Sequence, residues 1–509
     1  MSTALDVQAV NDATAGSAGA PDRSPRTGQL IFLVQQPDPQ RAWALRTLGR
    51  WLGVSVVPAA SDGDVDVYVG HDAASARRAR VWIRPETQNV RRALDQGRAV
   101  LAGRPDATRL APTALRQAQE PICSTVPADQ AAATPFGFDV LAAVAHLLTG
   151  GDARDVAERD PHGRLPDSHT WPVLAGLDAM PVCQMWAGLL ADALRARGWV
   201  AERRPVWPDA KRWAAVLTHD VDLPQRYDSD GRLRKARALW SRRRPAAALR
   251  QCAAAGFAAA RNALGQPDAS WSFGDWMDFE TSLGFRSTWA FLAITVDEPG
   301  ASLHDARYRI ASPRYRTLLR NMQARGFEAA LHAGYDAALN TDAPAAQRRR
   351  LGRAAVASIQ GVRHHFWRLS AEQPAITWRR HAAAGLEYDL SVSFTARPGF
   401  RCGSGLPFRP FDPQSGRELN FLVLPSTLMD AAVCRGRSFD DAVAAGIAHL
   451  ETCRRYGLCA VLDWNVRAWN DSRDCRGFGE VARALYRWLA EQNDVWVATA
   501  GDVARHWRD

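Results

Sequence analysis

The sequence predicts an α/β protein whose C-terminal part is a (β/α)7-like barrel, preceded by a small α/β domain and a helical bridge. Three observations predict this fold class. Short apolar runs alternate with a helix-like stretch in residues 29–125. Long amphipathic stretches then occupy residues 126–204. From 205 to 509, about seven strand-and-helix units follow one another, the pattern of a barrel of parallel strands.

The N-terminus, residues 1–28, is expected to be a disordered leader, because it is rich in Ala, Asp, Ser and Gly. It lacks the basic start and the apolar core of a secretory signal, which favours a cytoplasmic location. No apolar run in the sequence reaches the ~18 residues that a membrane span requires. We therefore expect no transmembrane segment.

The small α/β domain, residues 29–125, is predicted from five strand-like apolar runs: 30–34, 54–57, 65–69, 81–83 and 99–102. Residues 41–52 place apolar side chains at helical spacing between the first two runs. The domain has no G-x-G-x-x-G after a strand, so a dinucleotide site is not indicated. In the bridge, residues 126–204, helices are expected at 131–149 and 172–197.

The barrel, residues 205–509, is predicted from apolar strand candidates separated by helices. The strands are expected at 214–217, 287–292, 328–332, 361–366, 421–425, 458–463 and 495–499. The helices are expected at 276–283, 313–325, 343–359, 376–384, 439–456 and 479–492. A basic, Ala-rich insertion at 226–266 is expected to be a helical excursion over the barrel rim.

The net charge of +10 comes from 64 basic and 54 acidic residues. Only two of the basic residues are lysines, so the excess of arginine and alanine is typical of a GC-rich genome. We therefore expect no nucleic-acid partner, although a basic surface can also face anionic polysaccharide or phospholipid. None of the eight cysteines forms a C-x-x-C pair, which argues against a zinc ribbon.

Polar side chains gather where three strand candidates end, and the carboxyl ends of barrel strands are where barrel enzymes place their chemistry. Asp220 and Asp222 follow the first strand and share a face of the extended chain. Two such carboxylates can divide the work, one binding a cation and one moving a proton. His332 ends the third strand and His365 the fourth. One Asp with two His suits a zinc-like ion that keeps an open position.

These residues lie in a series of short motifs. The series is Thr218-His219-Asp220-Val221-Asp222, Leu331-His332-Ala333-Gly334-Tyr335, Arg363-His364-His365-Phe366-Trp367, Tyr388-Asp389-Leu390-Ser391, Gly399-Phe400-Arg401-Cys402-Gly403 and Pro407-Phe408-Arg409-Pro410-Phe411. In content and order it resembles a divergent bacterial branch of the polysaccharide deacetylases, a carbohydrate esterase family. The resemblance covers about residues 205–509, and the N-terminal region also looks like the one that accompanies this branch.

The resemblance implies a metal-dependent hydrolase that removes an N-acetyl group from a sugar of a surface polysaccharide or its precursor. The cofactor is expected to be a divalent metal, zinc before others, held by Asp222, His332 and His365. Asp220 is then the catalytic base. The reverse assignment, with Asp222 as the base and Asp220 on the metal, remains open. Asp336 is the alternative to His365, because the family's second motif has a histidine at that position.

Further roles also follow from the resemblance. Arg401 and Asp389 are expected to hold the base and the substrate in register. Asp463 stands in the last motif, where the family has a histidine, and can protonate the leaving amine only if burial raises its pKa. Tyr335, His364 and Phe408 are expected to contact the substrate.

Two histidines of the family pattern are missing, one from the second motif and one from the last. The alternative function is therefore a catalytically degenerate, deacetylase-like protein that binds a saccharide or a partner without turnover. Either way the expected ligand is a carbohydrate. The oligomeric state is not predicted.

Overall fold

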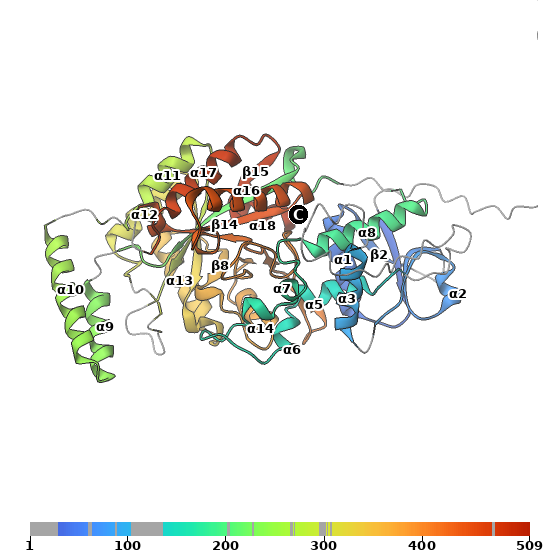
Figure 1. Ribbon diagram of the computed structural model, residues 1–509, viewed down its shortest axis with the longest axis horizontal. Coiled ribbons are helices and arrows are strands. Elements are labelled where there is room, and N and C mark those ends of the chain that lie inside the picture. Colours follow the sequence, from blue (N-terminus) through green and yellow to red (C-terminus); the bar gives the residue numbers. More distant parts are fainter. Residues whose placement is uncertain are drawn as a thin grey trace, which may run out of the picture.

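The computed structural model describes residues 29–59, 64–86, 89–102, 136–200, 204–225, 229–264, 268, 270–294, 302, 304–305, 308–470 and 474–508. The expected leader and the expected boundary near residue 125 lie outside the described residues. Figure 1 shows two separate sheets, each with its own helices, and a helical pair that stands away from both. The predicted α/β class is confirmed.

The N-terminal sheet has four parallel strands in the order β2-β1-β3-β4. They are β1 (Gln29–Val34), β2 (Ser55–Pro58), β3 (Val65–Val69) and β4 (Ala79–Ile83), with helices α1 (Pro39–Trp51), α2 (Ala73–Ala76) and α3 (Val90–Ala102). The strand expected at 99–102 is wrong, because these residues form the last turn of α3. Its buried residues Leu94, Gly97 and Leu101 recur at helical spacing, which an apolar run of four residues cannot reveal.

The bridge consists of α5 (Val140–Leu148), α6 (Asp152–Asp155), η2 (Asp167–His169), α7 (Trp171–Leu174) and α8 (Val182–Ala196). Helix α5 packs against α1 and α3 of the N-terminal sheet. The single helix expected at 172–197 is interrupted, because Gly176 adopts a left-handed conformation with φ of 68° and α8 begins only after Pro181. The intervening chain contacts the loop after β9, where Phe400 donates its backbone N–H to the Asp178 carbonyl.

The C-terminal sheet has nine strands, ordered β12-β9-β8-β7-β6-β5-β14-β13 with β15 also paired to β5. They are β5 (Trp213–Val221), β6 (Thr288–Leu292), β7 (Glu328–Ala333), β8 (Gly361–His364), β9 (Tyr388–Asp389), β12 (Leu422–Val423), β13 (Leu428–Met429), β14 (Cys459–Asn465) and β15 (Val495–Ala498). Every strand pair within it is parallel. This curled parallel sheet is the predicted barrel-like unit. Strands β9 and β13 were not predicted, because two residues are too short to show a period.

Helices cover the C-terminal sheet, and every residue of its central strand β5 is buried. The helices are α11 (Phe273–Ser282), α12 (Pro313–Ala324), α13 (Ala343–Ala355), α14 (Pro374–Ala383), α15 (Asp430–Cys434), α16 (Phe439–Tyr456), α17 (Phe478–Ala490) and α18 (Ala500–Arg508). Short turns η3 (Pro208–Ala210), η4 (Tyr335–Ala338), η5 (His365–Trp367) and η6 (Val466–Trp469) and the hairpin of β10 (Phe411–Asp412) with β11 (Arg417–Glu418) complete this part.

The insertion between β5 and α11 forms two helices, α9 (Ser229–Ser241) and α10 (Pro245–Ala263), which pack on each other. Figure 1 shows this pair away from the sheet and from the helices that cover it. Among the helices of the described residues, none combines the length and the apolar character needed to cross a bilayer.

Candidate metal centre and its carboxylate–arginine network

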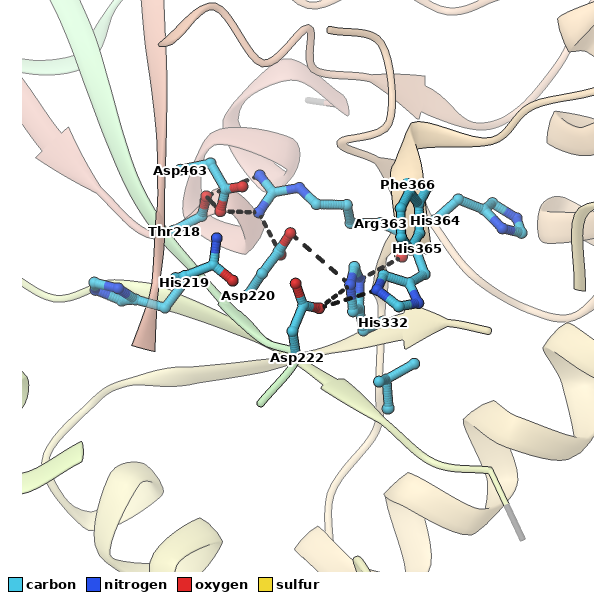
Figure 2. A network of polar contacts seen from close by, with 12 residues as sticks. Thr218, His219, Asp220, Asp222, His332, Arg363, His364, His365, Phe366 and Asp463 are labelled. Carbon is cyan, nitrogen blue, oxygen red and sulfur yellow. Dashed lines mark hydrogen bonds and ion pairs between the residues drawn. The ribbon is translucent and has the colours of Figure 1, made fainter. Parts of the chain in front are cut away.

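Four predicted site residues meet at one edge of the C-terminal sheet. Asp220 is near the end of β5 and Asp222 follows that strand, while His332 lies in β7 and His365 directly follows β8. Because these strands are parallel, their carboxyl ends share an edge, and the side chains converge there (Figure 2).

Asp222, His332 and His365 form a compact set of potential metal ligands. One atom from each, the two histidine nitrogens and a carboxylate oxygen, lie within 4.8 Å of one another. His332 Nε2 is 2.9 Å and His365 Nε2 is 3.5 Å from Asp222 Oδ1. Asp336 is not in this set, since it pairs with Arg368 and its side chain is 47% exposed. Three ligands leave a coordination position open, as in catalytic zinc sites.

Both histidines are held in the orientation that a metal requires. His332 Nδ1 donates a hydrogen bond to the Arg363 carbonyl oxygen at 3.1 Å, and His365 Nδ1 lies 2.7 Å from Asp305 Oδ1. With each Nδ1 committed to an oxygen, each Nε2 faces Asp222. Such an oxygen partner behind a ligating histidine sets the tautomer and the direction of the ring. The donor set therefore fits a divalent cation.

The electrostatics of this set favour a cation. Burial alone raises the pKa of Asp222, but His365, His332 and Arg467 outweigh it and hold that pKa well below its ordinary value. Burial lowers the pKa of His332, yet the charges of Asp220 and Asp222 dominate and raise it to about 9. These charges favour the protonated form of His332. A divalent cation would take the place of that proton.

Asp220 is fixed by Arg363, which is completely buried. Arg363 Nη1 is 2.8 Å from Asp220 Oδ1 and 2.6 Å from Asp463 Oδ1, and Nη2 donates to Thr218 Oγ1 at 2.8 Å. Burial lowers the pKa of Arg363, but Asp463 and Asp220 outweigh it and raise that pKa. Asp220 Oδ2 lies 3.9 Å from His332 Nε2, so Asp220 borders the ligand set without belonging to it.

Strand alternation decides which side chains reach this network. Thr218 and Asp220 point to one side of β5, whereas the ring of His219 points to the other (Figure 2). His219 is fully buried there, with Nε2 2.7 Å from Glu280 Oε1. Arg363 and His365 likewise flank His364, whose fully buried ring contacts His381 at 2.8 Å between the Nε2 atoms. The predicted substrate contact of His364 is therefore corrected: this residue faces the protein interior.

The strand expected at 361–366 ends early, at His364, because the next residues form η5. Phe366 and Trp367 have φ of 58° and 56°, a left-handed conformation that is unfavourable for aromatic residues. Arg164, from the bridge, donates from Nη1 to the Phe366 carbonyl oxygen at 2.7 Å. The bridge thus supports the turn that follows His365.

Asp463 lies behind Arg363 as seen from the ligand set (Figure 2). Its side chain is fully buried, and burial raises its pKa well above the ordinary value, against the effect of Arg363. The raised pKa agrees with what a proton donor needs. The position does not, because Asp463 Oδ1 is engaged by Arg363 and Thr218 inside the protein. Direct protonation of a leaving amine by Asp463 is therefore not what this geometry favours.

Arg401 and Asp389 do not contact Asp220. Arg401 Nη2 donates to the Leu165 carbonyl oxygen at 3.4 Å, and Nη1 is 3.8 Å from Asp167, so this residue faces the bridge. It lines a cavity of about 100 Å³ between the bridge and the ends of β8 and β9. Asp389 is fully buried and binds the Ser391 backbone N–H and His381. The arginine that contacts Asp220 is Arg363 and not the predicted Arg401.

The two remaining predicted substrate contacts differ from each other. Tyr335 follows β7, and its hydroxyl is 3.1 Å from Nδ1 of His162 in the bridge, so its contact with substrate stays a prediction. Phe408 is only 2% exposed and packs edge-on against Trp378. A side chain buried in this way stabilises the fold and does not face a ligand.

Three functional residues were missed from the sequence. Arg363 stands in a quoted motif and is two residues from His365, so strand alternation could have placed it on the same side. Arg467, whose Nη1 is 3.9 Å from Asp222 Oδ2, follows the last motif strand. Asp305 belongs to a segment without periodicity, and no signal in the sequence connects it with His365.

Comparison with solved structures finds similar folds at low sequence identity. A candidate polysaccharide deacetylase from Mycobacterium smegmatis is 16% identical and matches 59% of this chain and 92% of its own, with a TM-score of 0.40. The allantoinase Puue is 16% identical and matches 60% of this chain and 93% of its own, with a TM-score of 0.38. A candidate polysaccharide deacetylase from Pseudomonas aeruginosa PAO1 is 15% identical and matches 60% of this chain and 94% of its own, with a TM-score of 0.37.

No protein-family model matches the chain, and no curated protein matches it in sequence. The solved structures include proteins of the kind that the sequence motifs resemble. At TM-scores below 0.5 their likeness carries no argument about activity, which is inferred below from the residues of this chain.

Proposed function

We propose that the protein is a metal-dependent amide hydrolase that removes an N-acetyl group from a saccharide. The observation that carries this proposal is the convergence of Asp222, His332 and His365 within 4.8 Å, beside the separate carboxylate of Asp220. A pure scaffold has no need for such a cluster of buried ionisable groups. The motifs that resemble polysaccharide deacetylases support the same class of substrate.

A divalent cation held by Asp222, His332 and His365 would act as a Lewis acid toward the acetyl carbonyl and lower the pKa of a water molecule. Zinc is the first candidate, because one carboxylate and two imidazoles are ligands that zinc prefers. Asp220 borders this set of ligands, with Oδ2 3.9 Å from His332 Nε2. The residues of the chain supply the remaining chemistry.

Asp220 is the proposed general base. The ion pair with Arg363 holds one oxygen of Asp220, so that the other oxygen can accept the proton of the attacking water. Water then adds to the acetyl carbon, the C–N bond breaks, and acetate and the free amine result. Asp220, which took up the proton of the water, returns it to the leaving amine. A single carboxyl group acting first as base and then as acid makes a histidine in the last motif unnecessary.

The test combines metal analysis with an acetate-release assay. Protein purified without a metal-binding tag is analysed by mass spectrometry, before and after incubation with zinc, beside His332→Ala. The control variant is His71→Ala, which removes an exposed histidine of the N-terminal sheet's domain. We expect about one metal ion per chain, lost in His332→Ala and retained in His71→Ala, together with metal-dependent acetate release from N-acetylated oligosaccharides.

Two outcomes would contradict the proposal in different ways. If no metal binds even after incubation with zinc, the centre is not a metal site and the mechanism fails. If metal binds but no N-acetylated saccharide is hydrolysed, the alternative of a saccharide-binding protein without turnover takes its place.

A further inference from the structure

The α9–α10 pair carries most of the chain's excess positive charge. Residues 229–264 contain nine Lys or Arg and one Asp, a net charge of +8, compared with +10 for all 509 residues. Outside this segment the sequence is therefore nearly neutral. The arginine-rich composition of the whole chain does not explain such an excess, because elsewhere acidic residues balance the arginines.

Large apolar side chains are exposed on the same helical pair. Five of the eleven large hydrophobic residues exposed in the described part of the chain lie in this short segment: Leu233 (42% exposed), Trp240 (62%), Leu249 (62%), Phe257 (60%) and Leu264 (74%). Leu233 and Trp240 are seven residues apart within α9, so they lie on one side of that helix. Exposed apolar side chains gathered in this way mark an interaction surface.

The packing between α9 and α10 is inverted relative to an ordinary amphipathic hairpin. The buried positions are small, namely Ala236, Ala248, Ala255 and Ala258. Of the large apolar side chains, Leu239 is half-buried, whereas Leu233, Trp240, Leu249 and Phe257 are exposed. In a helical pair that is stable in water, the large apolar residues usually face the partner helix and the core. Large apolar residues are thus exposed on this pair. They contribute favourable free energy only when they are buried against another apolar phase.

Arginines stand among these apolar side chains. Arg237, Arg242 and Arg250 are all exposed, within a few residues of Trp240 or Leu249. Helices that lie in the interface of a bilayer combine basic residues with Trp, Phe and Leu, the basic groups near lipid phosphates and the apolar groups below them. Nucleic acid offers phosphates but little for exposed Leu and Trp to bury against. A second copy of the same hairpin would bring two strongly positive segments together.

From this combination we propose that the α9–α10 pair binds the surface of an anionic phospholipid membrane. The pair would lie in the headgroup region, with Trp240 and Leu249 inserted and the arginines on lipid phosphates; α10 is not apolar enough to span the bilayer. The insertion begins just after the strand that carries Asp220, so the membrane-binding element and the candidate metal centre belong to adjacent parts of the chain. This binding does not depend on the proposed hydrolysis.

The test is flotation of the full chain with vesicles of phosphatidylcholine alone and of phosphatidylcholine mixed with phosphatidylglycerol. We expect binding to the anionic vesicles only, weakened at ~1 M salt, where the screening length falls to ~3 Å. The variant R237Q/R242Q/R250Q should lower partitioning on the order of 100-fold, since each arginine near an anionic surface contributes about fivefold. W240S/L249S should also abolish flotation, because the apolar anchors are gone.

Matched variants control for composition and folding. L174S/L339S removes two exposed leucines elsewhere, and R417Q/R435Q/R476Q removes three exposed arginines elsewhere. Both should float like the unchanged protein, and all variants should keep its thermal unfolding midpoint. His332→Ala should also float normally, so that a failure of the metal centre and a failure of membrane binding are distinguished.

Three results would overturn the proposal. The first is absence of flotation with anionic vesicles, or flotation that the hairpin variants do not change. The second is retention on duplex DNA that requires the three arginines but neither Trp240 nor Leu249, which would make the pair a polyanion-binding element. The third is a concentration-dependent dimer that W240S/L249S dissociates, which would make the pair a contact between two copies.

Discussion

Arg363 and Asp220 form a buried ion pair, with Arg363 Nη1 2.8 Å from Asp220 Oδ1. The same nitrogen is 2.6 Å from Asp463. One guanidinium thus compensates two carboxylates inside the protein. In the sequence the nearest candidate for this task was Arg401, which instead contacts the bridge.

This arrangement predicts unequal effects of removing the two arginines. Arg363→Met leaves Asp220 and Asp463 buried without their cation, so we expect a loss of about 3 to 5 kcal/mol in the free energy of unfolding. Arg401→Met removes only long contacts and should change it by about 1 kcal/mol or less. Urea denaturation measures both. Equal effects would show that Arg363 does not have the structural role assigned to it.

The roles of Asp220 and Asp222 can be separated by isosteric changes. Asp222→Asn should lose bound metal, because an amide oxygen is a far weaker zinc ligand than a carboxylate. Asp220→Asn should keep the metal and lower acetate release by about 10² or more, the usual contribution of a general base. Metal analysis and activity are measured on the same preparations. The opposite pattern would exchange the two assignments.

Asp305 should tune the affinity for metal although it is not a ligand. It orients His365 through Nδ1 at 2.7 Å, and loss of such a partner typically weakens metal binding by about 10- to 100-fold. We expect this range for Asp305→Asn in a chelator-competition titration. Asp336→Asn is the matched control, since Asp336 is half exposed and pairs with Arg368. An effect of Asp336→Asn as large as that of Asp305→Asn would argue for Asp336 as a ligand.

His449 predicts a pH dependence of stability that is separate from the metal centre. It lies in α16 against Cys453 and Phe400, and burial lowers its pKa from 6.5 to about 4. As pH falls from 6.5 to 4, the unfolded chain binds a proton that the folded chain does not, so stability decreases by about 3 kcal/mol over this window. His449→Leu should lose less stability over the same range. Parallel curves of unfolding free energy against pH for the two proteins would refute this assignment.

The strands and helices that position the candidate site were largely predictable. β5, β7 and β14 are apolar runs that end in polar residues, a local pattern that survives in the structure. The prediction of one long bridge helix at 172–197 was wrong, because Gly176 in a left-handed conformation interrupts it. Two-residue strands such as β9 could not be predicted from the sequence, because two residues are too few to show the alternation of a strand. Their existence depends on pairing with neighbouring strands.

Strand position decides whether a predicted residue faces the candidate site or the protein interior. His364 and Asp389 stand in motifs that mark the site, but each faces the protein interior, where His381 contacts both. The period of two along an extended strand contains this information for His364, because Arg363 and His365 occupy the opposite side. Phe408 had no such local signal, and its burial depends on packing against Trp378.

The α/β class, the order of the polar motifs and the position of Asp222, His332 and His365 at strand ends were all predictable from the amino-acid sequence. These features are local, since strand periodicity and the chemistry of a side chain depend on a few neighbouring residues. Three features required the folded structure: Arg363 fixes Asp220, Asp305 orients His365, and most large apolar residues of α9 and α10 are exposed. Each of these depends on which distant segments meet, and such contacts result from packing of the whole chain.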